Sequence, residues 1–254
     1  VGATENILIA ACFAKGKTIM KNCACEPEIK DLSNFLIKCG CKIRWTGKRS
    51  IEVAGINELQ STTYKIIFDR IEAGTYAIAA ALTGGKVIIK NINPNIIKTE
   101  LNVLKKMGVK IKKDNNQIQI INNNNLKKID LITSPYPGFP TDLQAQMMVL
   151  LCKANKSSTI QENNFENRSM HVAELNRMGA QIKTNGNMAK IEGNTNFTAA
   201  ELMATDLRAS VSLILAALTT KSKSVINRIY HLDRGYENIE KKLKKVGANI
   251  RRIN

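Results

Sequence analysis

The amino-acid sequence predicts an α/β fold made of repeated units of about 70 residues, with buried helices inside and sheets outside. Two observations support this fold class. Four segments with the pattern of an amphipathic helix end in a glycine that a strand-like run follows, and these evenly spaced glycines are Gly40, Gly108, Gly179 and Gly247. Each segment is preceded by a helix-like run that is apolar nearly all round.

The apolar runs come first in each unit, at residues 7–11, 77–82, 147–152 and 211–218. A helix without a polar stripe is buried on most of its sides, so we expect these four helices in the core. None reaches the roughly 18 apolar residues of a membrane-spanning helix. Because the sequence also carries no signal-peptide pattern, we expect a cytoplasmic protein without membrane association.

The second helix of each unit is expected to be amphipathic. Leu32 and Leu36 lie on one face of such a helix, and Ile239 and Leu243 repeat the pattern in the last unit. The closing glycine marks the C-terminus of the helix, where a left-handed residue is needed and glycine adopts it most easily. Strands are expected after every closing glycine, the last one included, and in the β-branched runs at residues 18–20, 87–89 and 224–226.

The chain of 254 residues carries a net charge of +17, from 38 basic and 21 acidic residues. The lysines are scattered over all units, and an aromatic content of 5% leaves few side chains for stacking on bases. We therefore expect no nucleic-acid partner, although the positive charge would attract an anionic small molecule.

The six cysteines include two C-x-C pairs, Cys23 with Cys25 and Cys39 with Cys41. Structural zinc sites use wider spacings, and a free cysteine packs as a small hydrophobic residue. We expect no metal, no cofactor and no disulfide.

The polar groups that could carry chemistry lie at the starts of helices. Asp142 and Asp206 fit the N-cap position, which aspartate favours. Arg70 and Arg208 do not fit, because cations are disfavoured at a helix N-terminus. Each of these arginines therefore needs an acidic neighbour or an anionic ligand.

By the symmetry of the repeats, three arginines, Arg168, Arg208 and Arg234, are expected to converge with Asp142 and Asp206. Guanidiniums bind phosphate and carboxylate groups in a bidentate manner, and an aspartate among them could accept a proton from an alcohol. The pattern favours a cleft for a phosphorylated or carboxylated small molecule. An internal network of ion pairs is the alternative that these residues leave open.

Long motifs lie at residues 26–29, 69–75, 136–146, 165–172, 203–210 and 228–237. Together they resemble the UDP-N-acetylglucosamine 1-carboxyvinyltransferases, enolpyruvyl transferases of the EPSP synthase-like family, and the resemblance runs from Val1 to Asn254. The shikimate-pathway sibling lacks this set. The resemblance implies an inside-out α/β barrel, with residues 1–67 as the last repeat unit of a first, catalytic domain and 68–254 as a second domain of three units.

The resemblance also implies a reaction, the first committed step of peptidoglycan synthesis. The 3-hydroxyl of UDP-N-acetylglucosamine adds to C2 of phosphoenolpyruvate, phosphate then leaves, and the enzyme is expected to be a monomer. At matching positions, Asp142 would take the hydroxyl proton, Asp206 would be a second acid/base group, and Arg234 would also be catalytic. Substrate contacts are implied for Val1, Gly2, Arg70, Asp142, Asn164, Arg168, Arg208 and Arg234.

The family's N-terminal portion, with a Lys-Asn pair and a loop that carries a catalytic cysteine, has no counterpart in this sequence, which begins at Val1. We therefore expect a fragment that is inactive alone. Two alternatives are kept. The shikimate-pathway sibling would turn over shikimate 3-phosphate. A non-catalytic binding module would be either a regulatory remnant or a basic nucleic-acid binder, and a steep salt dependence of binding to random DNA would favour it.

Overall fold

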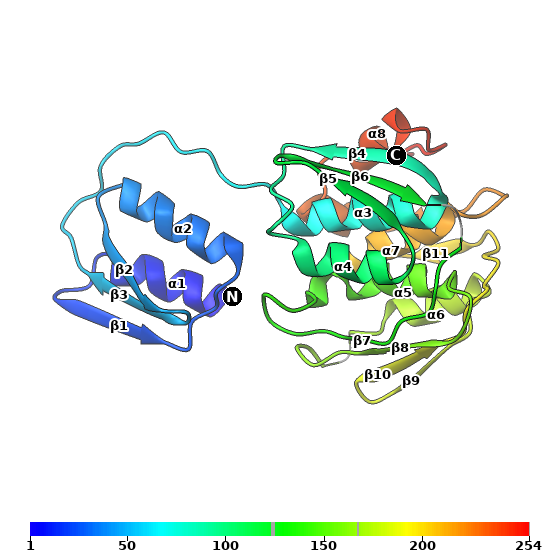
Figure 1. Cartoon of the computed structure of the whole chain (residues 1–254), viewed down its shortest axis with the longest axis horizontal. Coiled ribbons are helices and arrows are strands. Elements are labelled where there is room, and N and C mark those ends of the chain that lie inside the picture. The colour runs from blue at the N-terminus through cyan, green and yellow to red at the C-terminus, as the bar shows by residue number, and fades with distance from the viewer. Residues whose placement is uncertain (123–124, 167, 254) are drawn as a thin grey trace. The chain divides into compact units, whose positions relative to one another are not determined.

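The computed structural model describes residues 1–122, 125–166 and 168–253, which form two compact units (Figure 1). Unit 1 consists of Val1–Phe68 and Pro135–Pro137, and unit 2 of Asp69–Ser134 and the chain from Gly138 onward. Among the residues described, no helix has both the length and the apolar character needed to cross a membrane.

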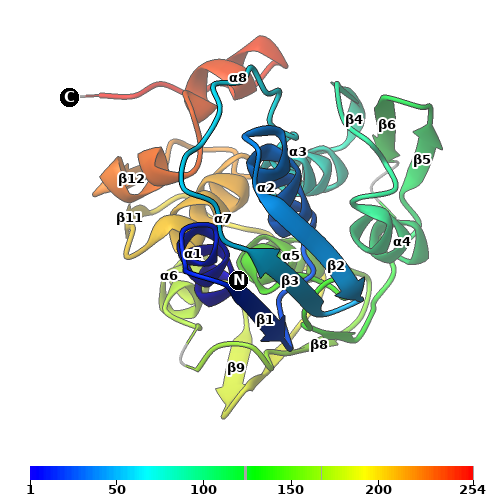
Figure 2. The same ribbon diagram turned by 90° about the vertical axis from the view of Figure 1, so that its left-hand side faces the viewer.

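Unit 1 is one layer of two helices on a three-stranded antiparallel sheet of order β1-β3-β2 (Figure 2). The elements in chain order are α1 (Gly2–Ala11), β1 (Lys17–Lys21), α2 (Pro27–Lys38), β2 (Lys42–Gly47) and β3 (Ser50–Ala54). Leu8 of α1, Leu36 of α2, and Ile51 and Val53 of β3 are buried in one core. Residues 51 and 53 face the helices because side chains two apart share a face of a strand.

Helix α1 is less buried than its apolar sequence predicts, and that prediction is wrong for this helix. Thr4, Leu8 and Ala11 are buried, but Ile7 is 51% and Ile9 47% exposed. Within unit 1, α1 packs mainly against α2 and β3, and its side with Ile7 and Ile9 stays exposed.

The segment after β3 has neither helix nor strand, yet it is fixed to α2. Asp31 accepts hydrogen bonds from Tyr64 Oη at 2.8 Å and from the backbone N–H of Ile67 at 3.3 Å. Lys38 Nζ donates to the carbonyl of Thr63 at 2.7 Å. These contacts satisfy polar groups that would otherwise need water.

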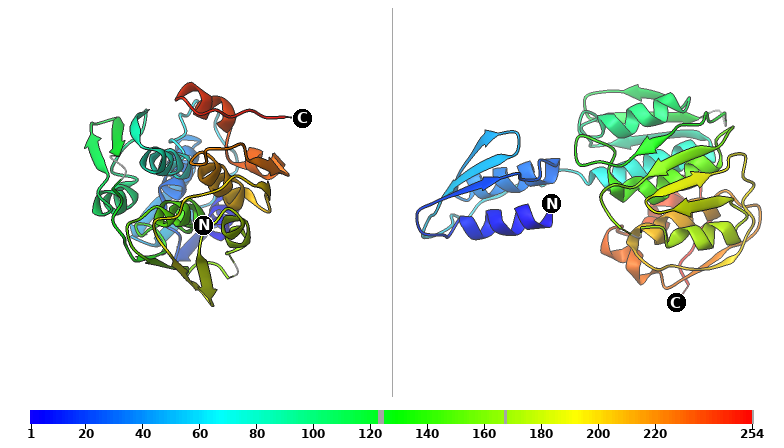
Figure 3. Two further views of the ribbon diagram at one scale, coloured as in Figure 1. Left: turned by 90° about the vertical axis from the view of Figure 1, so that its right-hand side faces the viewer. Right: turned by 90° about the horizontal axis from the view of Figure 1, so that it is seen from below.

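Unit 2 has three buried helices at its centre, α3 (Arg70–Thr83), α5 (Gln144–Cys152) and α7 (Leu207–Ala217). Helix α5 is buried along its whole length and packs against both α3 and α7. The sheets lie outside these helices, as the left view of Figure 3 shows. Three buried helices with sheets around them are what all-round apolar helices require.

The sheets of unit 2 are small, and one of them repeats the order seen in unit 1. Strands β4 (Gly85–Lys90), β5 (Lys110–Lys113) and β6 (Gln117–Asn122) form a sheet of order β4-β6-β5. The second sheet has the order β7-β8-β10-β9, and β11 pairs with β12 in parallel. The strands of the second sheet are β7 (Leu131–Ile132), β8 (Ser158–Gln161), β9 (Ile182–Asn185) and β10 (Met188–Ile191). The parallel pair consists of β11 (Glu201–Met203) and β12 (Val225–Asn227).

The remaining helices of unit 2 are short. They are α4 (Lys98–Lys106), α6 (His171–Arg177), α8 (Ile239–Lys245) and the 3₁₀ helices η1 (Thr141–Leu143) and η2 (Ile229–Arg234). The mixed α/β class is confirmed, and all four closing glycines have a positive φ, between 95° and 102°.

The strand predicted after Gly247 is not formed, and residues 247–253 contain no strand. A strand needs a partner for its backbone hydrogen bonds. Arg252 in this stretch is instead held by an ion pair with Asp233. Strands β7 and β11, which run parallel to their partners, were not predicted.

The six cysteines are free. Five are buried and Cys25 is half-buried. Burial raises the pKa of Cys12 and of Cys152 to about 12, as it does for thiols in apolar surroundings. The described residues contain no group of three or more histidine, cysteine or acidic side chains that could hold a metal ion.

Candidate active site

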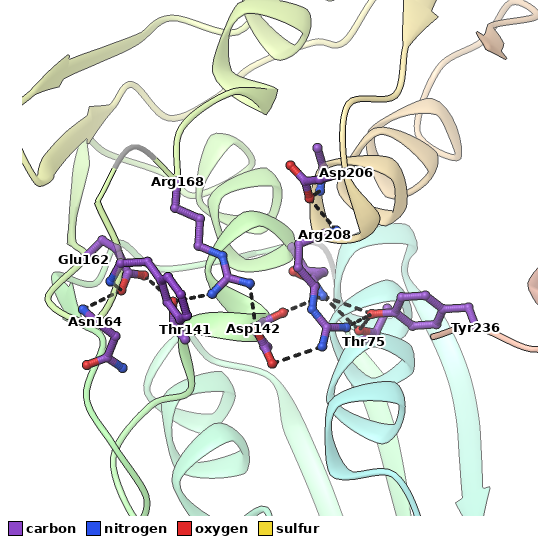
Figure 4. A network of polar contacts seen from close by, with 12 residues as sticks. Thr75, Thr141, Asp142, Glu162, Asn164, Arg168, Asp206, Arg208 and Tyr236 are labelled. Carbon is purple, nitrogen blue, oxygen red and sulfur yellow. Dashed lines mark hydrogen bonds and ion pairs between the residues drawn. The ribbon is translucent and has the colours of Figure 1, made fainter. Parts of the chain in front are cut away.

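Asp142 lies between two arginines in unit 2, with one arginine on each carboxylate oxygen (Figure 4). Arg168 Nη2 donates to Oδ1 at 2.6 Å, and Arg208 Nη2 donates to Oδ2 at 3.0 Å. All three side chains are half-buried. Charge-assisted hydrogen bonds of this kind are strong and directional.

Each of the three residues is positioned by its local structure. Asp142 lies in η1, the turn that leads into the buried helix α5. Arg208 is in the first turn of α7, which Asp206 caps by accepting hydrogen bonds from the backbone N–H groups of Arg208 and Ala209 at 2.7 and 2.9 Å. The prediction of an N-cap at Asp206 is confirmed, and Arg208 has the acidic neighbour that its place at a helix N-terminus requires.

The opposite charges of Asp142 and Arg208 favour the ionised form of each of these two groups. Burial by itself raises the pKa of Asp142, but the positive charges of Arg208 and Arg168 outweigh this and hold the pKa below its ordinary value. Burial lowers the pKa of Arg208, and the charge of Asp142 outweighs it in the opposite direction. Asp142 is therefore an ionised carboxylate at neutral pH.

The other end of Arg168 joins a second chain of contacts. Its Nη1 donates to Thr141 Oγ1 at 2.7 Å, and that hydroxyl donates to the buried carboxylate of Glu162 at 2.8 Å. Glu162 also accepts the backbone N–H of Asn164 at 2.8 Å. The guanidinium lies 5.0 Å from the ring centre of Phe165, which is within the range of a cation–π contact.

The other end of Arg208 joins a buried cluster of neutral groups. Its Nη1 lies 3.4 Å from Tyr236 Oη, which is 2.8 Å from Thr75 Oγ1. Gln146 Nε2 lies within 3.2 Å of both hydroxyls and 3.0 Å from the carbonyl oxygen of Asp142. Sequence reasoning missed this cluster, although an amide such as Gln146 in an otherwise apolar helix is a signal for a buried polar contact.

His171 is a further buried polar group close to this site. It begins α6 and is 3% exposed, and its Nε2 has no hydrogen-bond partner among the described residues. Burial lowers its pKa to about 4, and the nearby charge of Arg168 acts in the same direction while that of Asp206 opposes it. The ring is therefore neutral at physiological pH.

The structure does not bring every predicted site residue to Asp142. Arg70 begins α3 behind its N-cap Asp69, and its buried guanidinium lies 3.9 Å from Glu100 of α4. Arg234 ends η2 and is exposed, and it lines an open hollow with Lys242 and other residues.

Two other predicted contacts belong to unit 1. Val1 is the N-cap of α1 and Gly2 its first residue. The convergence of three arginines is thus realised for Arg168 and Arg208, whereas Arg234 lies in the hollow described above.

The arrangement can bind an anion. A guanidinium has five N–H donors, and contacts with described residues use two of them in Arg168 and two in Arg208. The donors that remain belong to adjacent cations that share one carboxylate. Such a pair suits phosphate or carboxylate groups, and Asp142 between them is placed to accept a proton.

Comparisons with known proteins show which sequences and folds this chain resembles. A sequence model of the family described as EPSP synthase (3-phosphoshikimate 1-carboxyvinyltransferase) matches residues 1–243. The chain is 69% identical over 254 residues to a UDP-N-acetylglucosamine 1-carboxyvinyltransferase of Pelagibacter ubique (strain HTCC1062), and covers 61% of that protein. It is 52% identical over 253 residues to the protein of that name in Rickettsia prowazekii (strain Madrid E), with all of this chain and 60% of the relative covered.

Solved structures show the same fold. The enolpyruvyl transferase NikO from Streptomyces tendae has a TM-score of 0.90 at 24% identity, with 98% of this chain and 60% of that chain covered. EPSP synthase from Acinetobacter baumannii has a TM-score of 0.76 at 18% identity, with the same coverage. The chain spans about 60% of the length of the relatives that it matches. Because the family model matches almost the whole of it, the chain belongs to the EPSP synthase (3-phosphoshikimate 1-carboxyvinyltransferase) family.

Proposed function

We propose that these 254 residues serve an enolpyruvyl transferase that moves the enolpyruvyl group of phosphoenolpyruvate to the 3-hydroxyl of UDP-N-acetylglucosamine and releases phosphate, a step of peptidoglycan synthesis. The observation that carries the proposal is Asp142 held between Arg168 and Arg208, in a chain 69% identical to a relative of that name. A site with two guanidiniums around one carboxylate suits a substrate that is both an acid and a phosphate.

The proposed role of Asp142 is to accept the proton of the sugar hydroxyl. The arginines lower its pKa, which keeps it ionised and ready to accept but weakens it as a base. An anionic substrate competes with Asp142 for the same guanidiniums. When the phosphate and carboxylate of phosphoenolpyruvate lie beside the remaining donors of these arginines, their negative charge offsets the positive charge that lowers the pKa of Asp142, and Asp142 becomes a stronger base.

Further roles follow from the family resemblance and stay proposals. Asp206 would be a second acid/base group through the carboxylate oxygen that does not cap α7. Arg234 would add positive charge for the phosphoenolpyruvate anion, an electrostatic contribution. Asn164, Val1 and Gly2 would contact the nucleotide sugar, and Arg70 would contribute to substrate binding.

We also propose the finer architecture that the family implies. Residues 1–67 would be the last repeat unit of a catalytic domain, and residues 68–254 a second domain of three units in an inside-out barrel. The strand order common to β1-β3-β2 and β4-β6-β5 supports repeated units. The enzyme would act as a cytoplasmic monomer without a metal or cofactor, and sedimentation of the purified protein tests the monomer.

A second candidate acceptor is 3-phosphoshikimate, because the family description names that substrate. The two candidates differ in the acceptor and share phosphoenolpyruvate. An assay that offers each acceptor separately therefore decides between them.

The test uses a chimera in which these 254 residues replace the matching stretch of the Pelagibacter ubique relative. Phosphate release from phosphoenolpyruvate is measured with each acceptor, beside the unaltered relative as positive control and the 254-residue chain alone. We expect release that depends on UDP-N-acetylglucosamine and is lost in Asp142→Asn, and no turnover by the chain alone.

Two results would overturn the proposal. A folded chimera that releases no phosphate while the relative does would exclude it. Release with 3-phosphoshikimate but not with the UDP-sugar would move the activity to the sibling reaction.

A further inference from the structure

We propose that Tyr236 is a positioning residue that holds the Arg208 guanidinium in the orientation needed to receive the substrate anion. The inference rests on the proposed function, because the anion is the phosphoenolpyruvate of that reaction. The observation is a juxtaposition: the phenol oxygen of Tyr236 meets Arg208 Nη1, while Nη2 of the same guanidinium meets Asp142 (Figure 4).

The two contacts act at both ends of one planar group. Arg208 Nη2 lies 3.0 Å from Asp142 Oδ2, and Nη1 lies 3.4 Å from Tyr236 Oη. A single contact leaves a guanidinium free to turn about that hydrogen bond. A second contact at the other terminal nitrogen removes this rotation, and the donors that are left point in one fixed direction.

The Tyr236 hydroxyl is itself held by buried neighbours. It accepts from Gln146 Nε2 at 3.2 Å and from Arg208, and it is 2.8 Å from Thr75 Oγ1. Gln146 Nε2 has two protons and three acceptors within reach, so the Thr75 and Tyr236 hydroxyls share one of them, and either hydroxyl can donate in the contact between the two. The Tyr236 hydroxyl thus has three polar neighbours inside a buried site, where a group without partners would be costly.

Gln146 connects this hydrogen-bonded cluster to Asp142. Its Nε2 also donates to the backbone carbonyl of Asp142 at 3.0 Å. A carbonyl oxygen can only accept, so this contact determines which end of the amide faces the two hydroxyls. Thr75 of α3, Gln146 of α5 and Arg208 of α7 therefore meet through Tyr236, and the three central helices of unit 2 jointly determine where Arg208 lies.

The choice of a phenol follows from the charges. An acidic side chain in place of Tyr236 would form an ion pair with Arg208 and compete with the substrate anion for it. Burial raises the pKa of Tyr236 despite the positive charge of Arg208, so the group stays neutral. Tyr236 thus orients the cation without neutralising it.

The first experiment measures Arg208 in the 254-residue chain. With ¹⁵N-labelled arginine, NMR gives the exchange rate of the Arg208 Nη protons with water, and Arg208→Lys identifies the signal. We expect Tyr236→Phe to raise this rate about tenfold, the scale set by one hydrogen bond to a charged group. The ring keeps its place in the apolar cluster with Val211, Ile239 and Leu243, so the variant is expected to fold.

Two further variants separate positioning from a general loss of order. Tyr64→Phe removes a phenol hydroxyl of the same kind that is bonded to Asp31 in unit 1, and it should leave Arg208 unchanged. Thr75→Val keeps the shape of its side chain but removes the partner of the Tyr236 hydroxyl, and it should raise the Arg208 exchange rate to a smaller extent. An unchanged Arg208 signal in folded Tyr236→Phe and Thr75→Val would overturn the proposal.

The second experiment places Tyr236→Phe in the active chimera. We expect kcat/KM for phosphoenolpyruvate to fall about tenfold, with the KM for the UDP-sugar unchanged, which a general loss of folding would not produce. Equal loss for both substrates would contradict a specific action on Arg208. If the chimera without this change were inactive, the proposed function would fail, and the NMR measurement would still decide whether Tyr236 positions Arg208.

Discussion

Replacing Gly74 by alanine tests whether the packing beneath Asp142 is as tight as the structure describes. Gly74 is buried in α3, and a Cβ added there would lie 2.5 Å from Cδ1 of Leu143. Leu143 is fully buried and directly follows Asp142 in η1. The added methyl group can fit only if the side chain of Leu143, which is fully buried next to Asp142, shifts.

Two opposing effects determine how much Gly74→Ala changes the unfolding free energy of unit 2. Overpacking a tight core costs about 1–3 kcal/mol, while alanine is favoured over glycine inside a helix by about 1 kcal/mol. Gly74→Ala should therefore destabilise unit 2 by up to ~2 kcal/mol. In a Leu143→Ala background, which by itself costs about 2–5 kcal/mol, the obstacle is gone and the same change should stabilise by about 1 kcal/mol.

The assay is hydrogen exchange of peptides from α3 and α5 in mild urea, measured for the two single variants and the double variant. The cycle isolates the coupling between residues 74 and 143. The chain has one tryptophan, Trp45, which lies in unit 1, so its fluorescence should show no change in any variant. The reasoning is refuted if Gly74→Ala stabilises unit 2 equally with leucine and with alanine at position 143.

Two further predictions concern the ionisable groups. Asp206→Ala should lower the unfolding free energy by about 1 kcal/mol through loss of the α7 cap, whereas Asp206→Asn should keep the cap and still abolish turnover of the chimera; full turnover by Asp206→Asn would leave Asp206 with a capping role alone. The chain has only two histidines, so the proton NMR signal of the His171 ring can be followed singly, and it should titrate near pH 4. Because this pKa lies below the ordinary 6.5, the unfolded chain binds the proton more readily, and stability falls as the pH is lowered from 6.5 toward 4. The loss between pH 7 and pH 5 should be about 2 kcal/mol and should disappear in His171→Gln; a His171 midpoint near 6.5 would contradict it.

Local features of the sequence were the most predictable from the residues alone. Gly40 and Gly179 end their helices with a positive φ because that backbone conformation depends on neighbouring residues only. The buried helix α5 follows equally from its own composition. The prediction failed for α1 and after Gly247, because an apolar pattern does not specify which element covers it and a strand cannot form without a partner.

Part of the candidate site was also predictable from local features of the sequence. An arginine at the start of a helix predicts an acidic neighbour or an anionic ligand, and Arg208 has such a neighbour in Asp142. The sequence did not identify Glu100 as the partner of Arg70. The contact between Thr75 and Tyr236 joins residues 161 apart in sequence. Such a contact depends on how helices pack against each other, and no spacing along the chain encodes that distance.

The buried cysteines can be used to detect unfolding by alkylation. Alkylating reagents react with the thiolate, which is scarce while burial keeps the pKa of Cys152 at about 12. Cys152 is the single cysteine of unit 2, and the other five belong to unit 1. Cys25 is half-buried and can react in the folded chain, so its labelling is left out. Among the five buried cysteines, the one that iodoacetamide labels first, located by mass spectrometry, reports which unit opens first.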